Sequence, residues 1–283
     1  MSTLTVLNAL SGVAILIVIV SGLFIILGLM DVINLMHPGL MAVGAYTALE
    51  VTRRGLSPWL AILVGALLAG ILGLVIERLV VRHIYHRNLD TILATWGLAL
   101  VTWQVLVLIF GRTAYPYRGP VQGIAEFGPI EYNSYRLLII GIAVVLVVVL
   151  GLVSRFTTAG LVARAVMSNE DLARGMGLNT AAVRAVTFGL GSALAGMAGV
   201  LLAPLAPVQP FIGLSYLIPA FLAVLLAGKT VWGLVLGSAV LGVGQSIVSV
   251  VLSPILAAAT LVILAVTILR FYPEGFDRLR RAG

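Results

Sequence analysis

The chain has 283 residues, of which 61 % are hydrophobic and only 10 % are charged, and its mean hydropathy is +1.17. Soluble domains carry about a quarter of charged residues, so this composition excludes a soluble protein. The absence of cysteine excludes disulfides, thiol catalysis and cysteine metal sites. The net charge of +7 indicates arginines that hold loops on one side of a membrane, and not the binding of a nucleic acid.

Nine apolar segments follow one another along the chain and predict an all-α, polytopic transmembrane helical bundle. Runs of about 20 apolar residues cross the hydrocarbon core as helices, and lipid admits only helices or closed barrels. Two segments are short, so we expect half-helices or re-entrant helices there, and about 8–9 membrane segments in a single domain over residues 1–283. The segments are residues 7–30, 36–51, 58–77, 90–110, 136–154, 184–203, 214–228, 230–251 and 254–271, the short ones being 36–51 and 214–228.

The distribution of basic residues predicts the orientation of these segments. If residues 155–184 lie in the cytoplasm and every segment spans, twelve of the 17 Lys and Arg residues lie on the cytoplasmic side, as the positive-inside rule requires. Residues 111–135 then form an extracytoplasmic loop, and the N-terminus lies outside. If 36–51 is re-entrant, the N-terminus lies inside and the later loops keep their sides. The first apolar segment lacks a basic n-region, so we expect a retained helix and not a cleaved signal peptide.

The extracytoplasmic loop 111–135 is rich in proline and tyrosine. Pro116, Pro120 and Pro129 interrupt any regular helix, and both signs of charge are present. Two interpretations remain open, a structured cap over the membrane segments or a simple long connection.

The polar loop 155–184 contains the signals of a short amphipathic helix at Ser168–Gly177. Ser168 or Asn169 can cap its start, and Gly177 can end it. Within it Glu170 and Asp171 suit the positive N-terminal end, and Glu170 reaches Arg174 at i+4. A short charged helix on a lipid-embedded protein indicates docking to something outside the membrane, while the alternative is a solvated loop.

Polar residues interrupt the apolar sequence at 31–46. Asn34 and His37 precede Pro38, which removes a backbone donor and breaks the preceding turn. Polar groups at such depth usually face a cavity or protein, although a plain loop between two helices is the alternative. His37 has no carboxylate cluster around it, so no metal site is predicted.

Small residues recur at four-residue spacing in two of the apolar segments. Gly191, Ala195 and Gly199 form one such row, and Gly233 and Gly237 form another. This spacing lets helix backbones approach closely. It predicts tight helix packing or, alternatively, helices that slide beside a narrow pathway.

The sequence holds no pattern typical of an enzyme. There is no Ser-His-Asp arrangement and no pair of carboxylates placed for acid–base chemistry, so we expect no catalytic residues. Ionisable residues that would relay protons in mid-helix are also scarce, which weakens a self-powered secondary transporter.

Four stretches resemble one family, the permease subunits of branched-chain amino-acid ABC importers, and specifically the shorter of its two paralogous types. They cover nearly the whole chain in order, and the third is the most specific. Pro38 and the turn LLAGKTVWG depart from the family's pattern, and both lie near the presumed substrate path. The four stretches are GLMDVINLMHPGLMAVGAY (28–46), RNLDTILATWGLAL (87–100), GLVARAVMSNEDLARGMGLNTAAVRAVTFGLGSALAGMAGVL (160–201) and FYPEGF (271–276).

The resemblance implies a permease domain in the bacterial inner membrane that works in a larger assembly. A paralogous or identical permease subunit, two cytoplasmic ATPase subunits and an extracytoplasmic substrate-binding protein would be its partners. ATP and magnesium would be bound by the ATPases, so no cofactor or catalysis is expected in this chain. Branched-chain amino acids are the expected substrates; alternatives are urea, short amides or small carboxylates, an ion-coupled secondary transporter, or a membrane scaffold or channel-like facilitator.

The same resemblance implies roles for individual residues. The helix at 168–177 would be the coupling helix that rests on an ATPase. Its polar rim contacts would be Glu170, Asp171 and Arg174, its apolar anchors Leu172 and Met176, and Gly175 would allow close approach. Candidate residues along the substrate path are Asn34, His37, Thr95 and Gln104.

Overall fold

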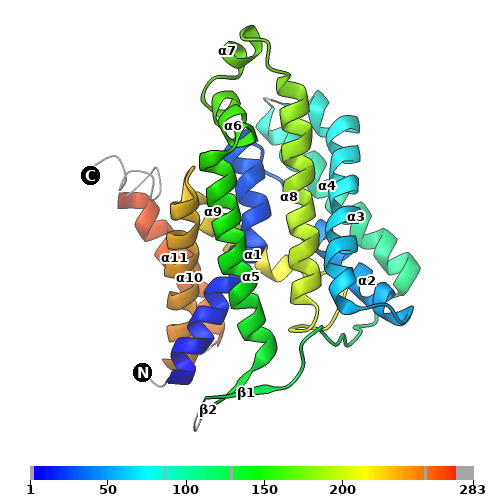
Figure 1. Ribbon diagram of the computed structural model, residues 1–283, viewed down its shortest axis with the longest axis vertical. Helices are drawn as coiled ribbons and strands as arrows, with labels where there is room; N and C mark the ends of the chain where they lie inside the picture. The colour runs from blue at the N-terminus through cyan, green and yellow to red at the C-terminus, as the bar shows by residue number, and fades with distance from the viewer. Residues whose placement is uncertain (1–2, 86, 128–129, 252–253, 272–283) are drawn as a thin grey trace. The chain divides into compact units, whose positions relative to one another are not determined.

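The computed structural model describes residues 3–85, 87–127, 130–251 and 254–271, and over these ranges the chain is predominantly helical (Figure 1). The α-helices are α1 (Thr3–Met30), α2 (His37–Arg53), α3 (Pro58–Leu79), α4 (Asn88–Phe110), α5 (Ser134–Phe156), α6 (Thr158–Ser168), α7 (Glu170–Gly175), α8 (Thr180–Leu202), α9 (Leu217–Ala227), α10 (Val231–Val251) and α11 (Pro254–Phe271). Two short 3-10 helices are η1 (Val81–His83) and η2 (Leu214–Tyr216), and one antiparallel hairpin consists of β1 (Ile124–Phe127) and β2 (Ile130–Asn133). The all-α prediction is confirmed.

Each of the nine predicted apolar segments coincides with a helix, but the count of 8–9 membrane segments is not confirmed. Six helices in the described ranges are long and apolar enough to cross a membrane: Thr3–Met30, Pro58–His83, Asn88–Phe110, Ser134–Phe156, Thr180–Leu202 and Val231–Ser249. Helix α2 has 17 residues and is about 26 Å long, less than the roughly 30 Å of the hydrocarbon core. The two segments expected to be short are indeed short, since α9 has 11 residues.

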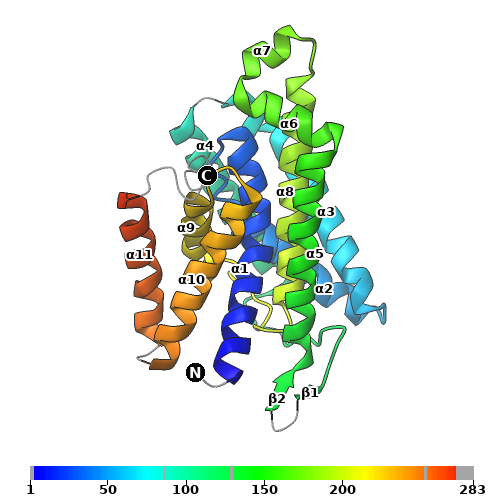
Figure 2. The ribbon, with the colours of Figure 1, turned by 60° about the vertical axis from the view of Figure 1, so that its left-hand side comes forward.

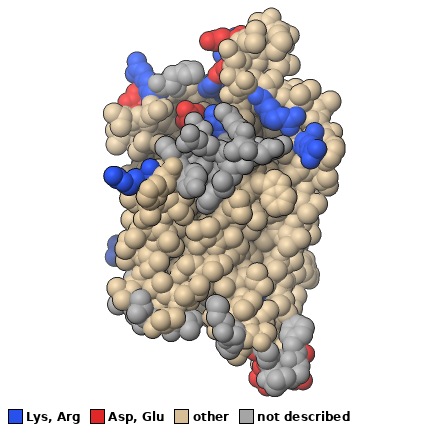
Figure 3. Space-filling view, turned by 90° about the vertical axis from the view of Figure 1, so that its left-hand side faces the viewer, with Lys and Arg blue, Asp and Glu red and all other residues tan. Residues whose placement is uncertain are grey.

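The surface in Figure 3 is dominated by uncharged side chains, with lysine and arginine confined to few places. Large apolar residues elsewhere on the molecule, such as Leu63, Leu67 and Leu108, are exposed as well. A soluble protein rarely exposes so many large apolar side chains, so these helix faces suit lipid. The multi-pass membrane character of the chain therefore follows from the structure as well as from composition.

The described helices divide into two compact units. The first contains Met1–Val20, Pro120–Leu150 and Ile218–Gly283, and the second contains Ser21–Gly119 and Gly151–Leu217. Helices α1 and α5 therefore each contribute residues to both units. The second unit carries the polar loop and all of the candidate site residues.

The core of the second unit is built from α2, α3 and α8, which approach at glycines. A methyl group on Gly196 of α8 would collide with Ala69 and with the backbone oxygen of Gly65 in α3. One on Gly199 would collide with the backbone of Met41 in α2. Only residues without a side chain permit such contact, and the close-packing prediction for the row in 187–200 is confirmed.

In the first unit the hairpin and α1 are joined by polar contacts. The Tyr132 hydroxyl donates to the backbone oxygen of Leu7 at 3.0 Å, and Arg136 donates to the side chain of Asn8 at 3.2 Å. The loop 111–135 thus contains regular structure, which excludes a plain connection. In the same unit Gly233 and Gly237 of α10 lie against the backbone oxygens of Ala227 and Ala223, so the second row of small residues also serves packing.

Candidate functional site: the polar loop and its anchor

The polar loop 155–184 folds as two helices and not one. Figures 1 and 2 show α7 beyond α6, close to the end of the molecule where α8 begins. Helix α6 (Thr158–Ser168) was not predicted, and α7 (Glu170–Gly175) is shorter than the expected Ser168–Gly177. The residues at both of its ends explain these limits.

Asn169 and Gly177 bound α7. The side-chain oxygen of Asn169 accepts a hydrogen bond from the backbone N–H of Leu172 at 2.9 Å, which satisfies one of the free donors of the first turn. Gly177 has a φ of 84°, a conformation that disfavours residues with a side chain. The N–H of Leu178 then returns to the oxygen of Ala173 at 3.1 Å, as in a Schellman ending. Of the two predicted caps, Asn169 is the one used.

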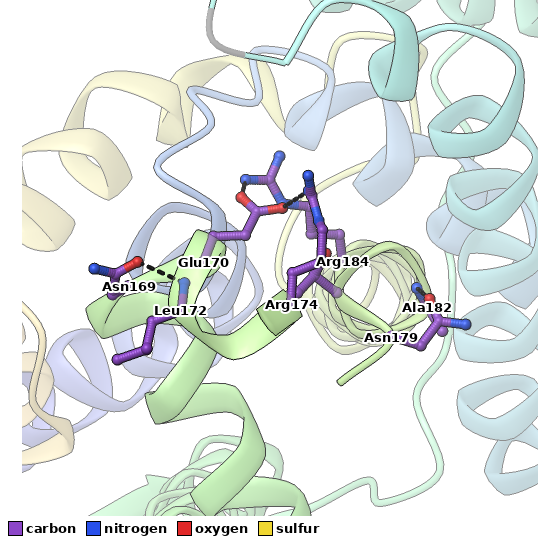
Figure 4. Close-up of polar contacts among 8 residues, drawn as sticks. Asn169, Glu170, Leu172, Arg174, Asn179, Ala182 and Arg184 are labelled. Atoms are coloured by element: carbon purple, nitrogen blue, oxygen red, sulfur yellow. Dashed lines mark hydrogen bonds and ion pairs between the residues drawn. The ribbon is translucent and has the colours of Figure 1, made fainter. Parts of the chain in front are cut away.

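Glu170 is held by two arginines. The predicted pair with Arg174 is present at 3.0 Å, and the second carboxylate oxygen forms an ion pair with Arg184 of α8. The side chains of Glu170 and Arg184 are only 16 % and 11 % exposed, so water screens their attraction little. In Figure 4 the Glu170 side chain points toward Arg184 and not outward. Glu170 was predicted as a rim contact, and the structure shows it anchoring α7 to α8.

Tyr85 and Glu77 extend this anchor to α3. The Tyr85 hydroxyl donates to the Glu77 carboxylate at 2.6 Å, and the Arg184 guanidinium lies 4.3 Å from the centre of the Tyr85 ring. Burial, reinforced by the hydrogen bond to Glu77, raises the pKa of Tyr85 well above its ordinary value. Tyr85 therefore stays a neutral donor at physiological pH, and Glu77, only 1 % exposed, keeps a hydrogen-bond partner.

The opposite face of α7 is exposed. Leu172 is 61 % and Met176 is 64 % exposed, and Leu172 points away from Glu170 in Figure 4. Asp171, Arg174 and Gly175 are exposed as well. The helix therefore combines an inward face bound to its own protein with an outward face that carries two uncovered apolar side chains.

A cleft of about 580 Å³ lies beside α7. Its lining comes from the segment after α3, from α7 and from the start of α8: Arg82, Tyr85, Glu170, Arg174, Leu178, Asn179, Thr180, Ala181 and Arg184. The guanidinium of Arg174 lies 3.5 Å from the Thr180 hydroxyl. The cleft thus lies between α7, the segment after α3 and the start of α8.

Further polar contacts of the second unit lie at the far end of α8. Residues after α8 return to Tyr115, whose backbone pairs in both directions with Val208 at 2.9 and 2.8 Å. The guanidinium of Arg53 lies 4.6 Å from the Tyr115 ring. The segments around 115 and 170 therefore lie near opposite ends of α8.

Three of the four candidate path residues lie together in the second unit. The backbone N–H of Leu35 donates to the Thr95 hydroxyl at 3.2 Å, and that of Met36 donates to the Asn34 side chain at 3.0 Å. Asn34 and Thr95 are fully buried, and the adjacent His37 is 1 % exposed. Gln104 is exposed on α4, apart from this group.

The interrupted backbone between α1 and α2 explains why Asn34 is buried there. Asp31 takes a left-handed conformation with a φ of 54°, which ends α1, and residues 31–34 are not helical. Because the helix is interrupted, the backbone N–H of Leu35 donates to the Thr95 hydroxyl and not to a helical carbonyl. The Asn34 Nδ2 donor has no hydrogen-bond partner among the described residues, although it is buried. A buried donor without a partner costs free energy, so its presence calls for an explanation such as a function.

These features, a non-helical segment between α1 and α2 in the core and a short helix with an exposed apolar face, belong to a multi-pass helical membrane protein of the permease class. The family model described as "Branched-chain amino acid transport system / permease component" matches residues 5–270, and the chain belongs to this family. Its relatives are permease components of transporters and not catalytic enzymes.

Individual relatives agree with this membership. The chain is 25 % identical to the high-affinity branched-chain amino acid transport system permease protein LivH of Salmonella typhimurium and 26 % identical to that of Escherichia coli K12. Each match covers 90 % of this chain and 88 % of the relative. A probable LivH permease of Methanocaldococcus jannaschii is 27 % identical over 73 % of this chain and 68 % of its own length.

A solved structure has a similar fold. A chain of PsaBC from Streptococcus pneumoniae, in complex with Fab, matches with a TM-score of 0.51 at 14 % identity. The match covers 92 % of this chain and 90 % of that one. At this identity the similarity concerns the fold alone.

Proposed function

We propose that this chain is the membrane-spanning permease subunit of an ATP-driven importer of branched-chain amino acids or similar small solutes. Its site would be the inner membrane of a bacterium. Two cytoplasmic ATPase subunits, an extracytoplasmic substrate-binding protein and a second permease subunit, identical or paralogous, would complete the transporter. ATP and magnesium would belong to the ATPases, and this chain would carry out no covalent chemistry.

The observation that carries the proposal is the exposed face of α7. An isolated helix of six residues is not stable in water. Helix α7 is stabilised by caps at both ends and by the ion pair of Glu170 with Arg184. Leu172 and Met176 remain uncovered on its outer face. Two apolar anchors within a polar rim of Asp171 and Arg174 match the usual composition of a docking surface for another protein.

The proposed substrate follows from the relatives. The names of three of them specify branched-chain amino acids. The buried Asn34, with its unpaired amide donor, and Thr95 are suitable for a small polar solute. Their place at the non-helical segment between α1 and α2 resembles the way transporters build sites at unwound backbone. Urea, short amides and small carboxylates carry acceptors of the same kind and are the alternatives.

Alternating access is the proposed mechanism. ATP binding would close the ATPase pair and displace α7, and the helices in contact with α7 would move with it and open the path outward. ATP hydrolysis would reset the permease.

Reconstitution tests the proposal directly. Liposomes would hold this chain with its candidate ATPases and permease partner, and radiolabelled leucine and the binding protein would be added outside. We expect leucine uptake that requires internal ATP and the binding protein. Uptake by this chain alone, driven by an ion gradient, would identify a secondary transporter and contradict the proposal.

A further inference from the structure

Four residues in the second unit form a continuous polar chain from α3 to α7. Glu77 lies near the C-terminal end of α3, Tyr85 follows η1, Arg184 lies in the first turns of α8 and Glu170 opens α7. The contacts are the Tyr85–Glu77 hydrogen bond at 2.6 Å, the Arg184–Tyr85 stacking at 4.3 Å and the Glu170–Arg184 ion pair. We name these four residues the anchor chain.

Two members of the anchor chain, Glu77 and Arg184, are buried, whereas ordinary surface charges are exposed. Glu77 is 1 % exposed and its second carboxylate oxygen has no hydrogen-bond partner among the described residues. Burying a carboxylate costs free energy, and a hydrophobic residue there would often be as stable or more so. Arg184, 9 % exposed, attracts Glu77 across the Tyr85 ring. A contribution to stability therefore does not explain why these four residues are present. A role in holding α7 in one position explains it.

Helices α2, α3 and α8, to which the anchor chain connects α7, are packed closely on one another. Helix α8 packs on α3 at Gly73, where any side chain would collide with Ser192, and on α2 at Gly44, where it would collide with Gly196. Closely packed helices move as a unit because their interior does not deform gradually. A displacement of α7 that is transmitted to Arg184 and Glu77 thus reaches α2, and with it the broken segment that holds Asn34.

Resting on the function proposed above, we infer that Glu77, Tyr85, Arg184 and Glu170 are positioning residues that transmit the displacement of α7 to α3 and α8. Without them α7 would still bind an ATPase through its outer face. Its displacement would then change the width of the cleft beside it and would not be transmitted to α3 and α8. The anchor chain would thus determine how many solutes are moved per ATP, and not whether the ATPases bind.

The first experiment measures the position of α7 in the full chain alone. Because the natural chain has no cysteine, Gly175→Cys on α7 and Arg78→Cys on α3 introduce two unique spin-label sites. We expect a narrow distance distribution in this parent, a broader one with Tyr85→Phe, which keeps the ring over Arg184, and the broadest with Tyr85→Leu. The control Arg87→Gln removes an exposed pair with Asp90 at the same end and should leave the parent distribution unchanged. Equal widths in all variants would overturn the inference.

The second experiment measures coupling in the reconstituted transporter. Tyr85→Leu and Glu77→Gln should capture the same amount of ATPase as wild type and retain ATP hydrolysis, while leucine transported per ATP falls at least about five-fold. Tyr85→Phe should lie between Tyr85→Leu and wild type. Unchanged transport per ATP in Tyr85→Leu would overturn the inference. Failure of the wild type itself to capture ATPases would instead contradict the proposed function, so the two failures are distinguishable.

Discussion

The carboxylate of Glu170 and the guanidinium of Arg184, fourteen residues apart in the chain, form an ion pair that joins the first residue of α7 to the start of α8. Both side chains are largely shielded from water. Removing one partner of such a pair leaves the other charge buried and unpaired, which costs more free energy than the pair itself contributes. The position of α7 therefore depends on this contact more than on its own short helical hydrogen-bond pattern.

Glu170→Gln should loosen α7 while the rest of the chain stays folded. The loss of a charged hydrogen bond to Arg184 costs about 1.5–3 kcal/mol. Tryptic cleavage after the exposed Arg174 should therefore speed up in native conditions. The control Glu50→Gln removes an exposed i,i+4 pair with Arg54 and should leave the cleavage rate as in wild type. A rate unchanged by Glu170→Gln would mean that α7 is held by other contacts.

Gly196→Ala should destabilise the second unit. The added methyl group would collide with Ala69 and the Gly65 backbone, so α8 would have to move away from α3, at a cost of about 1–3 kcal/mol. Gly97→Ala in α4 is the matched control, since nothing lies within 4 Å of its new methyl group and alanine favours helix. In detergent, the Tm of Gly196→Ala should be lower than that of the wild type, and the Tm of Gly97→Ala should be equal to it or higher. The reverse order would exclude close packing at Gly196.

Tyr85 should resist ionisation at alkaline pH. Because burial and the hydrogen bond to Glu77 raise its pKa above 10, its protonated form stabilises the folded state below pH 10, and this contribution is lost as the pH rises through the folded pKa. The difference in phenolate absorbance between wild type and Tyr85→Phe should therefore show no ionised Tyr85 at pH 10. A difference that corresponds to a half-ionised tyrosine at that pH would show that the ring is solvated.

Local sequence signals predicted much of the fold. Each apolar run became a helix because a lipid-facing backbone must satisfy its own hydrogen bonds. A helix in the α7 region was predicted from the capping ability of Ser168 or Asn169 and from Gly177, which act within a few residues of the helix, although α7 is shorter than the predicted Ser168–Gly177. The rows of small residues also predicted close packing, because four-residue spacing places them on one helix face.

Contacts between distant residues were not predictable in this way. Arg184 was interpreted as one more arginine of a cytoplasmic loop, and its pairing with Glu170 depends on the turn that brings α7 back to α8. The Tyr85–Glu77 hydrogen bond likewise depends on η1, a 3-10 helix without a strong sequence signal. Two long side chains that meet only after folding leave no periodic pattern in the sequence. The best available hint was Glu77 itself, a carboxylate next to a long apolar run.

The most direct test of the central claim is the capture of ATPases by α7. The tagged chain would be purified with its candidate ATPases as wild type, as Leu172→Ala/Met176→Ala and as the control Leu89→Ala, which truncates a similarly exposed residue in α4. We predict that wild type and Leu89→Ala capture ATPase equally and that the double variant captures at least about ten-fold less, because two apolar anchors are lost. Equal capture by the double variant and wild type, or no capture by the wild type, would contradict the assignment of α7 as the coupling helix.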